Sequence, residues 1–347
     1  MLGLDVRAGR AAWTVFLVSL LLAVTYLLRR VLLIFVVALL LAYLLTPLVN
    51  LVDRFRPRRF SRNWALAAVY IALLAVLVLL GSAVGAQVGR EAAELAKRLP
   101  VLIERIQQAL EAPGPPWLEQ VKQQLLEFLR ERAPSLATGV LPLIQGITSQ
   151  IMSILSGALA VILIPILAFF FLKDGPELRA AVLGAMSPER RAVFNDIFAD
   201  LHHLLGQFIR ALVLLALATL VAYGTFFALM RTPYALLLAS VAAVLEFIPM
   251  VGPLTAAAII VLVAAFRGLT HVLIILSFLG GYRLFQDYIL TPRLMSASVA
   301  LHPLLVIFGA LGGAELAGVW GVFLSVPVLA TLRVVYVRVR KAAAAAA

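Results

Sequence analysis

Long apolar runs follow one another along most of the chain. Those of about 20 residues or more cover 11–28, 31–52, 64–88, 151–172, 204–230 and 270–290. An α-helix rises about 1.5 Å per residue, so about 20 residues cross the roughly 30 Å hydrocarbon core of a membrane. The pattern therefore predicts six helices that each cross the membrane once.

Two further apolar stretches lie in the C-terminal third, and both are divided. In the first, Tyr234–Ile248 and Leu254–Phe266 meet at the sequence PMVGP, in which Pro249 and Pro253 flank Gly252. A proline inside a helix costs about 3 kcal/mol, so no continuous helix is expected there.

The second divided stretch, His302–Leu311 and Gly318–Tyr336, is expected to break at Gly312-Gly313. Each divided stretch either crosses the membrane twice or forms a re-entrant hairpin, and both alternatives return the chain to its starting side. The predicted fold is an all-α, polytopic transmembrane helix bundle. We expect about eight membrane segments, within a range of eight to ten, two of them divided or re-entrant hairpins.

The sequence between the third and fourth runs is polar. From Gly89 to about Gln145 it holds seven basic and seven acidic residues, and apolar residues recur at helical spacing on both sides of a break at 113–116. This pattern predicts an outer segment of two amphipathic helices joined by a turn.

The chain is therefore expected to divide into four parts. N-terminal transmembrane helices cover 1–88, and an amphipathic extracytoplasmic segment covers 89–150. A transmembrane core covers 151–341 and includes a cytoplasmic loop at 173–203. An added or unassigned alanine tail covers 342–347.

Charge sets the expected orientation. The chain is 63% apolar and 13% charged, whereas soluble domains are about half apolar and about a quarter charged. Its net charge of +12 is concentrated in the loop at 53–63 and near the C-terminus. Short basic loops beside apolar runs stay in the cytoplasm, so both termini are expected there. No basic stripe interleaves with aromatic residues, so we expect the lipid bilayer and no nucleic acid as a partner.

Motifs of catalytic sites are absent from the sequence. It contains no cysteine, no HExxH, no GxSxG, no P-loop and no glycine-rich dinucleotide fingerprint. The pair His202-His203 has no further ligands at metal spacing. We therefore expect no enzyme, no resident metal and no cofactor.

Three acidic residues lie in or beside apolar runs of the C-terminal third: Glu246, Asp287 and Glu315. An ionised carboxylate near the middle of a bilayer costs about 3 kcal/mol, so it usually faces a cavity or a partner. The alternative is that each lies at the membrane interface, where the cost falls and no function follows.

Glu246 has the most informative surroundings. Pro249, Gly252 and Pro253 follow within seven residues and free backbone groups from helical hydrogen bonds. Such groups are tolerated in a membrane only where protein or water surrounds them. Broken helix ends beside a carboxylate can coordinate a cation or hydrogen-bond a polar solute. A tight turn at the membrane surface with a glutamate nearby fits the same residues.

A second polar cluster lies near the end of the run at 270–290. Arg283 and Asp287 are four residues apart, so they share a helix face and can pair. We count Gln286, Asp287 and Arg293 with the Glu246 region as candidates for a solute or ion pathway. A structural ion pair is the alternative.

Two more residues are candidates for a proton relay, His302 and Glu315. A histidine titrates near neutrality, which suits proton transfer. A capping or interfacial role fits a lone histidine as well.

Six short motifs are spread over the chain: FFFLKDG at 169–175, GQ at 206–207, FIPMVGP at 247–253, TPRLM at 291–295, LHPL at 301–304 and GVWGVFLSVP at 318–327. Their shared polar and glycine positions include Lys173, Asp174, Gly175, Gly206 and Gln207. In these motifs the chain resembles the autoinducer-2 exporter family of bacterial transporters, also known as PerM-type permeases.

The resemblance implies a multi-pass secondary transporter of the bacterial cytoplasmic (inner) membrane that forms homo-oligomers, with its transport core at 151–341. It implies export of a small polar solute or signal such as autoinducer-2. The alternatives are sodium (lithium)/proton antiport, with Na⁺ or H⁺ as transported ions, and a non-transporting membrane scaffold or channel. Glu315 departs from the family pattern, in which small or apolar residues are expected at that place.

Overall fold

Every secondary-structure element in the described part of the chain is a helix, which confirms the all-α prediction. The structure is a computed structural model and describes residues 6–55, 62–111, 123, 158–249, 251–265, 267–294 and 301–346. The elements are α1 Val6–Leu27, α2 Arg29–Arg54, α3 Arg62–Glu111, α5 Ala158–Gly184, α6 Pro188–Leu229, α7 Ala235–Leu245, α8 Val251–Ala265, α9 Leu269–Phe285, the π-helix η1 Gln286–Leu290, α10 Thr291–Leu294 and α11 Pro303–Ala346.

Five helical segments in the described residues are long and apolar enough to cross a membrane. They are Val31–Arg54, Asn63–Arg98, Arg190–Leu229, Leu269–Leu294 and Pro303–Ala344. Four of the six predicted single spans are among them. The run at 11–28 gives a shorter apolar helix, and the run at 151–172 lies partly outside the described residues. The chain is a multi-pass helical membrane protein.

α3 continues well beyond its apolar run. It is one helix of 50 residues, about 75 Å long at about 1.5 Å per residue, and it continues without a break through the predicted change to amphipathic sequence at Gly89. A single glycine costs a helix only about 1 kcal/mol, and the i,i+4 pair of Glu94 and Arg98, 2.7 Å apart, supports the polar turns that follow. The second amphipathic helix, predicted after 113–116, lies outside the described residues.

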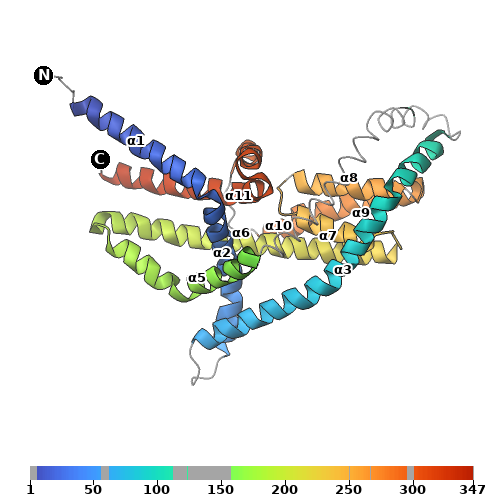
Figure 1. Cartoon of the computed structure of the whole chain (residues 1–347), viewed down its shortest axis with the longest axis horizontal. Helices are drawn as coiled ribbons and strands as arrows, with labels where there is room; N and C mark the ends of the chain where they lie inside the picture. The colour runs from blue at the N-terminus through green and yellow to red at the C-terminus, as the bar shows by residue number, and fades with distance from the viewer. Residues whose placement is uncertain are drawn as a thin grey trace.

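The polar half of α3 is attached to α7, beside which it passes in Figure 1. Glu91 Oε2 accepts a hydrogen bond of 2.9 Å from the backbone N–H of Leu237, in the first turn of α7. The N–H groups of a first turn have no partner within their own helix and carry the positive end of the helix dipole. The Glu91 carboxylate therefore stabilises the start of α7.

The polar connection at 173–203, whose residues have helix-like spacing, is largely helical. α5 continues through the KDG motif to Gly184, and α6 begins at Pro188, so the motif does not end the helix. The two polar arms are held together because Arg179 Nη2 donates a 2.7 Å hydrogen bond to Asn195 Oδ1. This hydrogen bond between the polar parts of α5 and α6 supports both helices where they continue beyond their apolar parts.

Three apolar clusters hold the helices together. One unites α6, α7, α8 and α9 with Leu95 of α3, a second joins α2, α3 and α5, and a third joins α2, α6 and α11. Between α6 and α9 the rings of Phe226 and Phe278 stack with centroids 3.7 Å apart. α6 takes part in two of the three clusters and lies centrally in Figure 1.

The first divided stretch forms α7 and α8, as predicted. The helices have 11 and 15 residues, about 16 and 22 Å, and each is shorter than the roughly 30 Å hydrocarbon core. They pack against each other within one apolar cluster. A Cβ at Gly252 would stand 1.8 Å from the carbonyl oxygen of Leu245. Only glycine lets the start of α8 approach the end of α7 this closely.

The second divided stretch breaks five residues later than predicted. Gly312 and Gly313 are helical, and the kink in α11 is at Ala317 and Gly318, where Gly318 has a φ of 59°. Gly313 serves close packing, because a Cβ there would overlap the carbonyl oxygen of Gly321, whereas a Cβ at Gly312 would meet no atom within 4 Å. The positive φ at Gly318 is the conformation that glycine adopts without steric cost.

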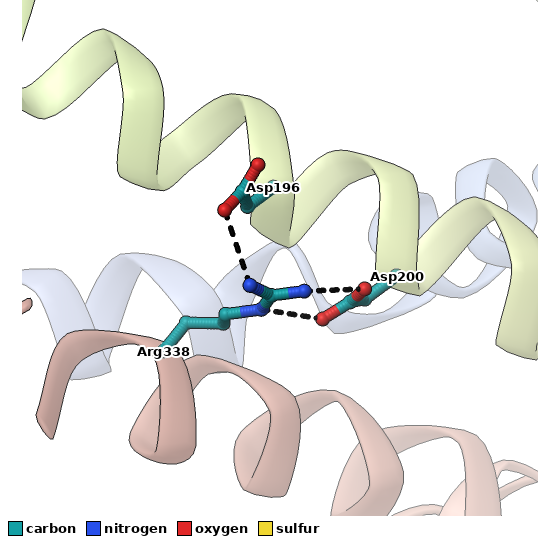
Figure 2. Close-up of polar contacts among 3 residues, drawn as sticks. All are labelled: Asp196, Asp200 and Arg338. Atoms are coloured by element: carbon teal, nitrogen blue, oxygen red, sulfur yellow. Dashed lines mark hydrogen bonds and ion pairs between the residues drawn. The ribbon is translucent and has the colours of Figure 1, made fainter. Parts of the chain in front are cut away.

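The C-terminal half of α11 is clamped to the polar start of α6, as Figure 2 shows. Arg338 donates from Nε and Nη2 to the two carboxylate oxygens of Asp200, at 2.7 and 2.9 Å, and from Nη1 to Asp196 at 3.1 Å. A guanidinium fork matches a carboxylate in this bidentate geometry. The clamp joins residues 138 positions apart and fixes the register of the two helices.

Candidate functional site

Glu246 lies at the end of α7, where the divided stretch breaks. Its backbone N–H still donates to the carbonyl of Ala242 at 3.1 Å, and the chain then turns through Pro249 before α8 begins. The side chain is only partly exposed. The carboxylate therefore stands at a broken helix end, as the sequence predicted.

Two buried side chains donate hydrogen bonds to the Glu246 carboxylate. Thr219 Oγ1 of α6 donates to Oε1 at 3.3 Å, and Gln286 Nε2 of η1 donates to Oε2 at 2.9 Å. Thr219 is fully buried and Gln286 is 2% exposed. Three segments far apart in the sequence thus meet at one carboxylate, which has a separate donor for each oxygen.

Tyr282 of α9 extends this arrangement. Its hydroxyl lies 3.2 Å from Thr219 Oγ1. An ionised carboxylate only accepts hydrogen bonds, so the Thr219 proton points to Glu246 and the Tyr282 proton points to Thr219. We call Glu246, Thr219, Tyr282 and Gln286 the Glu246 group.

The π-helix η1 places Gln286 in the group. It spans five residues, and the N–H of Thr291 donates to the carbonyl of Gln286, one residue further back than in an α-helix. Pro292 follows, and a proline has no N–H and clashes with the carbonyl four residues earlier, so a widened turn relieves the conflict. Tyr282 and Gln286 are one helical turn apart and face the same side.

Asp287 points elsewhere. Its Oδ2 accepts a 2.9 Å hydrogen bond from Arg283 Nε, and both side chains are close to half exposed, 46% and 44%. The predicted ion pair is therefore present. It forms no hydrogen bond with the Glu246 group.

The other candidates of this region are not hydrogen-bonded to the Glu246 group. Gly252 is buried and Pro253 partly exposed in the first turn of α8, while Arg293 is exposed on α10. His302 Nδ1 accepts a 3.2 Å hydrogen bond from the N–H of Leu304, so it caps the start of α11. Glu315 is exposed close to the kink in that helix.

The motif residues of α5 and α6 form a separate region. Lys173 and Asp174 are 3.7 Å apart, and Gly175 follows them within α5. Gln207 Nε2 lies 3.2 Å from His203 Nε2, and Gly206 is buried beside α2. Within the described ranges, no three acidic or histidine residues are placed to hold a metal ion.

Two members of the Glu246 group escaped sequence reasoning, Thr219 and Tyr282. Each is a single hydroxyl in a long apolar run, and such a hydroxyl usually bonds to a carbonyl of its own helix, as Thr46 and Ser277 do here. The spacing of Tyr282 and Gln286 by four residues was an available signal.

Chemically, the Glu246 group is a carboxylate enclosed by neutral donors. Protonation, a cation or the hydroxyl of a polar solute can each satisfy the carboxylate when Thr219 or Gln286 moves away. The arrangement therefore suits reversible binding, and its position between broken helices suits passage through a membrane protein.

Proteins of similar sequence carry the names of transport proteins and permeases. The chain is 24% identical over 309 residues to YueF of Bacillus subtilis (strain 168), named as a transport protein, covering 86% of this chain and 81% of YueF. It is 29% identical over 306 residues to MT0215 of Mycobacterium tuberculosis (strain CDC 1551 / Oshkosh), also named as a transport protein, covering 84% and 78%.

PerM of Escherichia coli (strain K12), named as a permease, is 26% identical over 309 residues, which cover 85% of this chain and 83% of PerM. The family model described as "AI-2E family transporter" matches residues 15–341. With the helical architecture and the broken segments around Glu246, this match shows that the chain belongs to the AI-2E family of transporters.

Proposed function

We propose that the chain is a secondary transporter that exports a small polar solute or signal of the autoinducer-2 kind, and that Glu246 is its binding carboxylate. One observation carries the proposal: the partly buried carboxylate lies at a broken helix and is held by Thr219 and Gln286 from two other segments. A polar solute replaces these two donors with its own hydroxyl groups, so the carboxylate stays hydrogen-bonded throughout the exchange.

The broken backbone contributes further polar groups. The turn between α7 and α8 interrupts the helical ladder beside the carboxylate. Backbone carbonyls and N–H groups of such half-helices bind solutes in transporters, because there they are shielded from lipid. Gly252 keeps the two half-helices close, so Glu246 and the turn form one binding surface.

Sodium (lithium)/proton antiport is the second candidate. The observation that favours it is the oxygen-rich composition of the group, in which the Thr219 and Tyr282 hydroxyls adjoin the Glu246 carboxylate. Oxygen ligands suit hard cations, and the carboxylate can exchange a proton for the cation.

Assays in a deletion strain test the first candidate. External autoinducer-2 is expected to fall on deletion and to return with the intact gene, but not with Glu246→Gln, which removes the charge and keeps the shape. Glu177→Gln is the matched control, because Glu177 is exposed on α5. Full export by Glu246→Gln would overturn the assignment of the carboxylate.

Proteoliposomes containing a pH-sensitive dye distinguish antiport from a scaffold role. Proton movement driven by sodium or lithium is expected only if the chain is an antiporter. If the intact protein moves neither autoinducer-2 nor these ions, a scaffold role replaces both transport proposals.

A further inference from the structure

A second polar region lies on the other side of α6, between α2, α5 and α6. Arg210 is within the apolar run of α6, six residues or about 9 Å beyond Leu204, where that run begins. Its side chain is partly buried. An arginine at this depth is costly and is usually retained for a specific partner.

The guanidinium of Arg210 is held in place but left largely unpaired. Its Nε donates a 2.6 Å hydrogen bond to the carbonyl of Gly206, one turn earlier. Nη1 and Nη2 have no hydrogen-bond partner, and Arg210 forms no ion pair with any residue that the structure describes. The guanidinium therefore has four N–H donors free for a ligand.

Gly206 makes room for this guanidinium beside Tyr43 of α2. The point where a Cβ of Gly206 would lie is 3.4 Å from Arg210 Nη2 and 3.9 Å from Tyr43 Cδ1. The Tyr43 ring in turn meets the ring of His202, with centroids 5.1 Å apart. Arg210, Tyr43 and His202 thus surround one place where α2 and α6 meet.

The charges around this place are positive. Arg179 of α5 is tied to α6 because it donates a 2.7 Å hydrogen bond to Asn195, about two turns of helix before His202, and Arg210 lies about two turns after His202. The acids of the neighbouring turns of α6, Asp196 and Asp200, are both occupied by Arg338, as Figure 2 shows. No carboxylate of the described residues neutralises Arg179 or Arg210 by an ion pair.

The floor of the region is apolar. Leu40 of α2 and Leu205 and Ile209 of α6 form a buried cluster with Tyr43 packed against it. A soluble anion needs only the charges, whereas a lipid also needs an apolar surface that continues into the membrane. Basic pockets between transmembrane helices bind phosphate headgroups in this way.

We propose that Arg210, Arg179 and Tyr43 form a binding site for the phosphate group of an anionic membrane lipid. Arg210 meets two phosphate oxygens with its free fork, Arg179 adds a second charge, and the Tyr43 hydroxyl is a further donor. The acyl chains follow the apolar surface of α2 and α6.

Native mass spectrometry of the full chain in nanodiscs tests the proposal, with phosphatidylcholine alone or mixed with phosphatidylglycerol. Arg210→Gln is expected to bind phosphatidylglycerol about tenfold more weakly than the unchanged chain. Arg210→Lys is expected to bind phosphatidylglycerol with an affinity between those of the unchanged chain and Arg210→Gln, since lysine keeps the charge and lacks the forked guanidinium. Arg190→Gln, on an exposed part of α6, is the control and is expected to bind normally.

Two results would overturn the proposal. One is equal phosphatidylglycerol binding by the unchanged chain, Arg210→Gln and Arg210→Lys. The other concerns the thermal midpoint of unfolding of the chain in phosphatidylcholine nanodiscs. If added inorganic phosphate raises this midpoint as much as phosphatidylglycerol does, the site binds a soluble anion and not a lipid. Should Arg210→Gln fail to fold, Arg179→Gln serves in its place, since Arg179 is exposed and its replacement removes one hydrogen bond, the one to Asn195.

Discussion

At the scale of single residues, the Glu246 group is defined by the direction of its hydrogen bonds. While Glu246 is ionised, the protons point from Tyr282 to Thr219 and from Thr219 to the carboxylate. A proton on Glu246 gives that side chain a donor of its own, so Thr219 can turn its proton toward Tyr282. The charge of one partly buried carboxyl group thereby sets the orientation of two hydroxyls on two other helices.

Removal of the Tyr282 hydroxyl tests this chain of hydrogen bonds. Tyr282→Phe keeps the ring and leaves Thr219 without its second partner, so transport is expected to weaken about fivefold, the equivalent of about 1 kcal/mol. The measurement is the initial transport rate in proteoliposomes. Tyr223→Phe is the control, because Tyr223 belongs to the same aromatic cluster and its hydroxyl has no hydrogen bond to the described residues. Equal rates for both variants would contradict the role of Tyr282.

At the scale of elements, the breaks in the helices matter more than their lengths. The sequence is enough to predict helices and a break beside Pro249, because prolines disfavour a continuous helix there. The break begins earlier than predicted, after Leu245, and Gly252 and Pro253 lie in the first turn of α8. The kink in α11 was misplaced, since Gly312-Gly313 and Gly318 are equally able to break a helix. Their roles depend on which backbone lies opposite, and a single sequence does not contain that information.

Gly252→Ala tests the contact between α7 and α8. The added Cβ would overlap the carbonyl of Leu245, which is backbone and cannot rotate away. We expect loss of folded protein or a fall in unfolding free energy of about 4 kcal/mol or more. Gly280→Ala in α9 is the control, since a Cβ there meets no atom within 4 Å. Thermal unfolding in detergent measures both, and similar midpoints would contradict the close packing.

The connection between α3 and α7 is a second test at this scale. Glu91→Ala removes the carboxylate that binds the N–H of Leu237, so we expect a loss of about 0.5–2 kcal/mol of stability, the usual worth of a helix cap. Glu91→Gln keeps an acceptor and is expected to lose less. Glu94→Ala is the control, because Glu94 pairs only within α3. The thermal midpoints of the three variants rank their losses of stability. An equal loss of stability for Glu91→Ala and Glu94→Ala would argue against a capping role of Glu91.

At the scale of the whole molecule, contacts between distant segments decide what sequence reasoning can find. Glu246, Gln286 and the Arg283–Asp287 pair could be predicted because each stands out within its own run. Thr219 could not be predicted, since its partners lie 27 and 63 residues away. The continuity of α3 was missed for the opposite reason, because a change in polarity was mistaken for an end of the helix.

The clamp between α6 and α11 gives a test for the whole chain. The absence of cysteine allows spin labels at two introduced cysteines, Ala199→Cys and Val339→Cys, without background. Arg338→Gln is expected to broaden the distance distribution between the labels, because the bidentate bond to Asp200 is lost. Arg340→Gln, one residue from the label and exposed, is the control. An unchanged distribution in Arg338→Gln would show that apolar packing alone fixes the two helices.

α6 is one continuous helix, and this gives it a mechanical role. Thr219 in the Glu246 group, Arg210 beside α2 and Asp200 in the clamp all project from it, and the outer two are 19 residues or about 28 Å apart. A continuous helix transmits rotation and sliding along its axis with little loss. Under the proposed function, a shift of α6 at Thr219 would therefore also move Arg210 and the contact with the C-terminal half of α11.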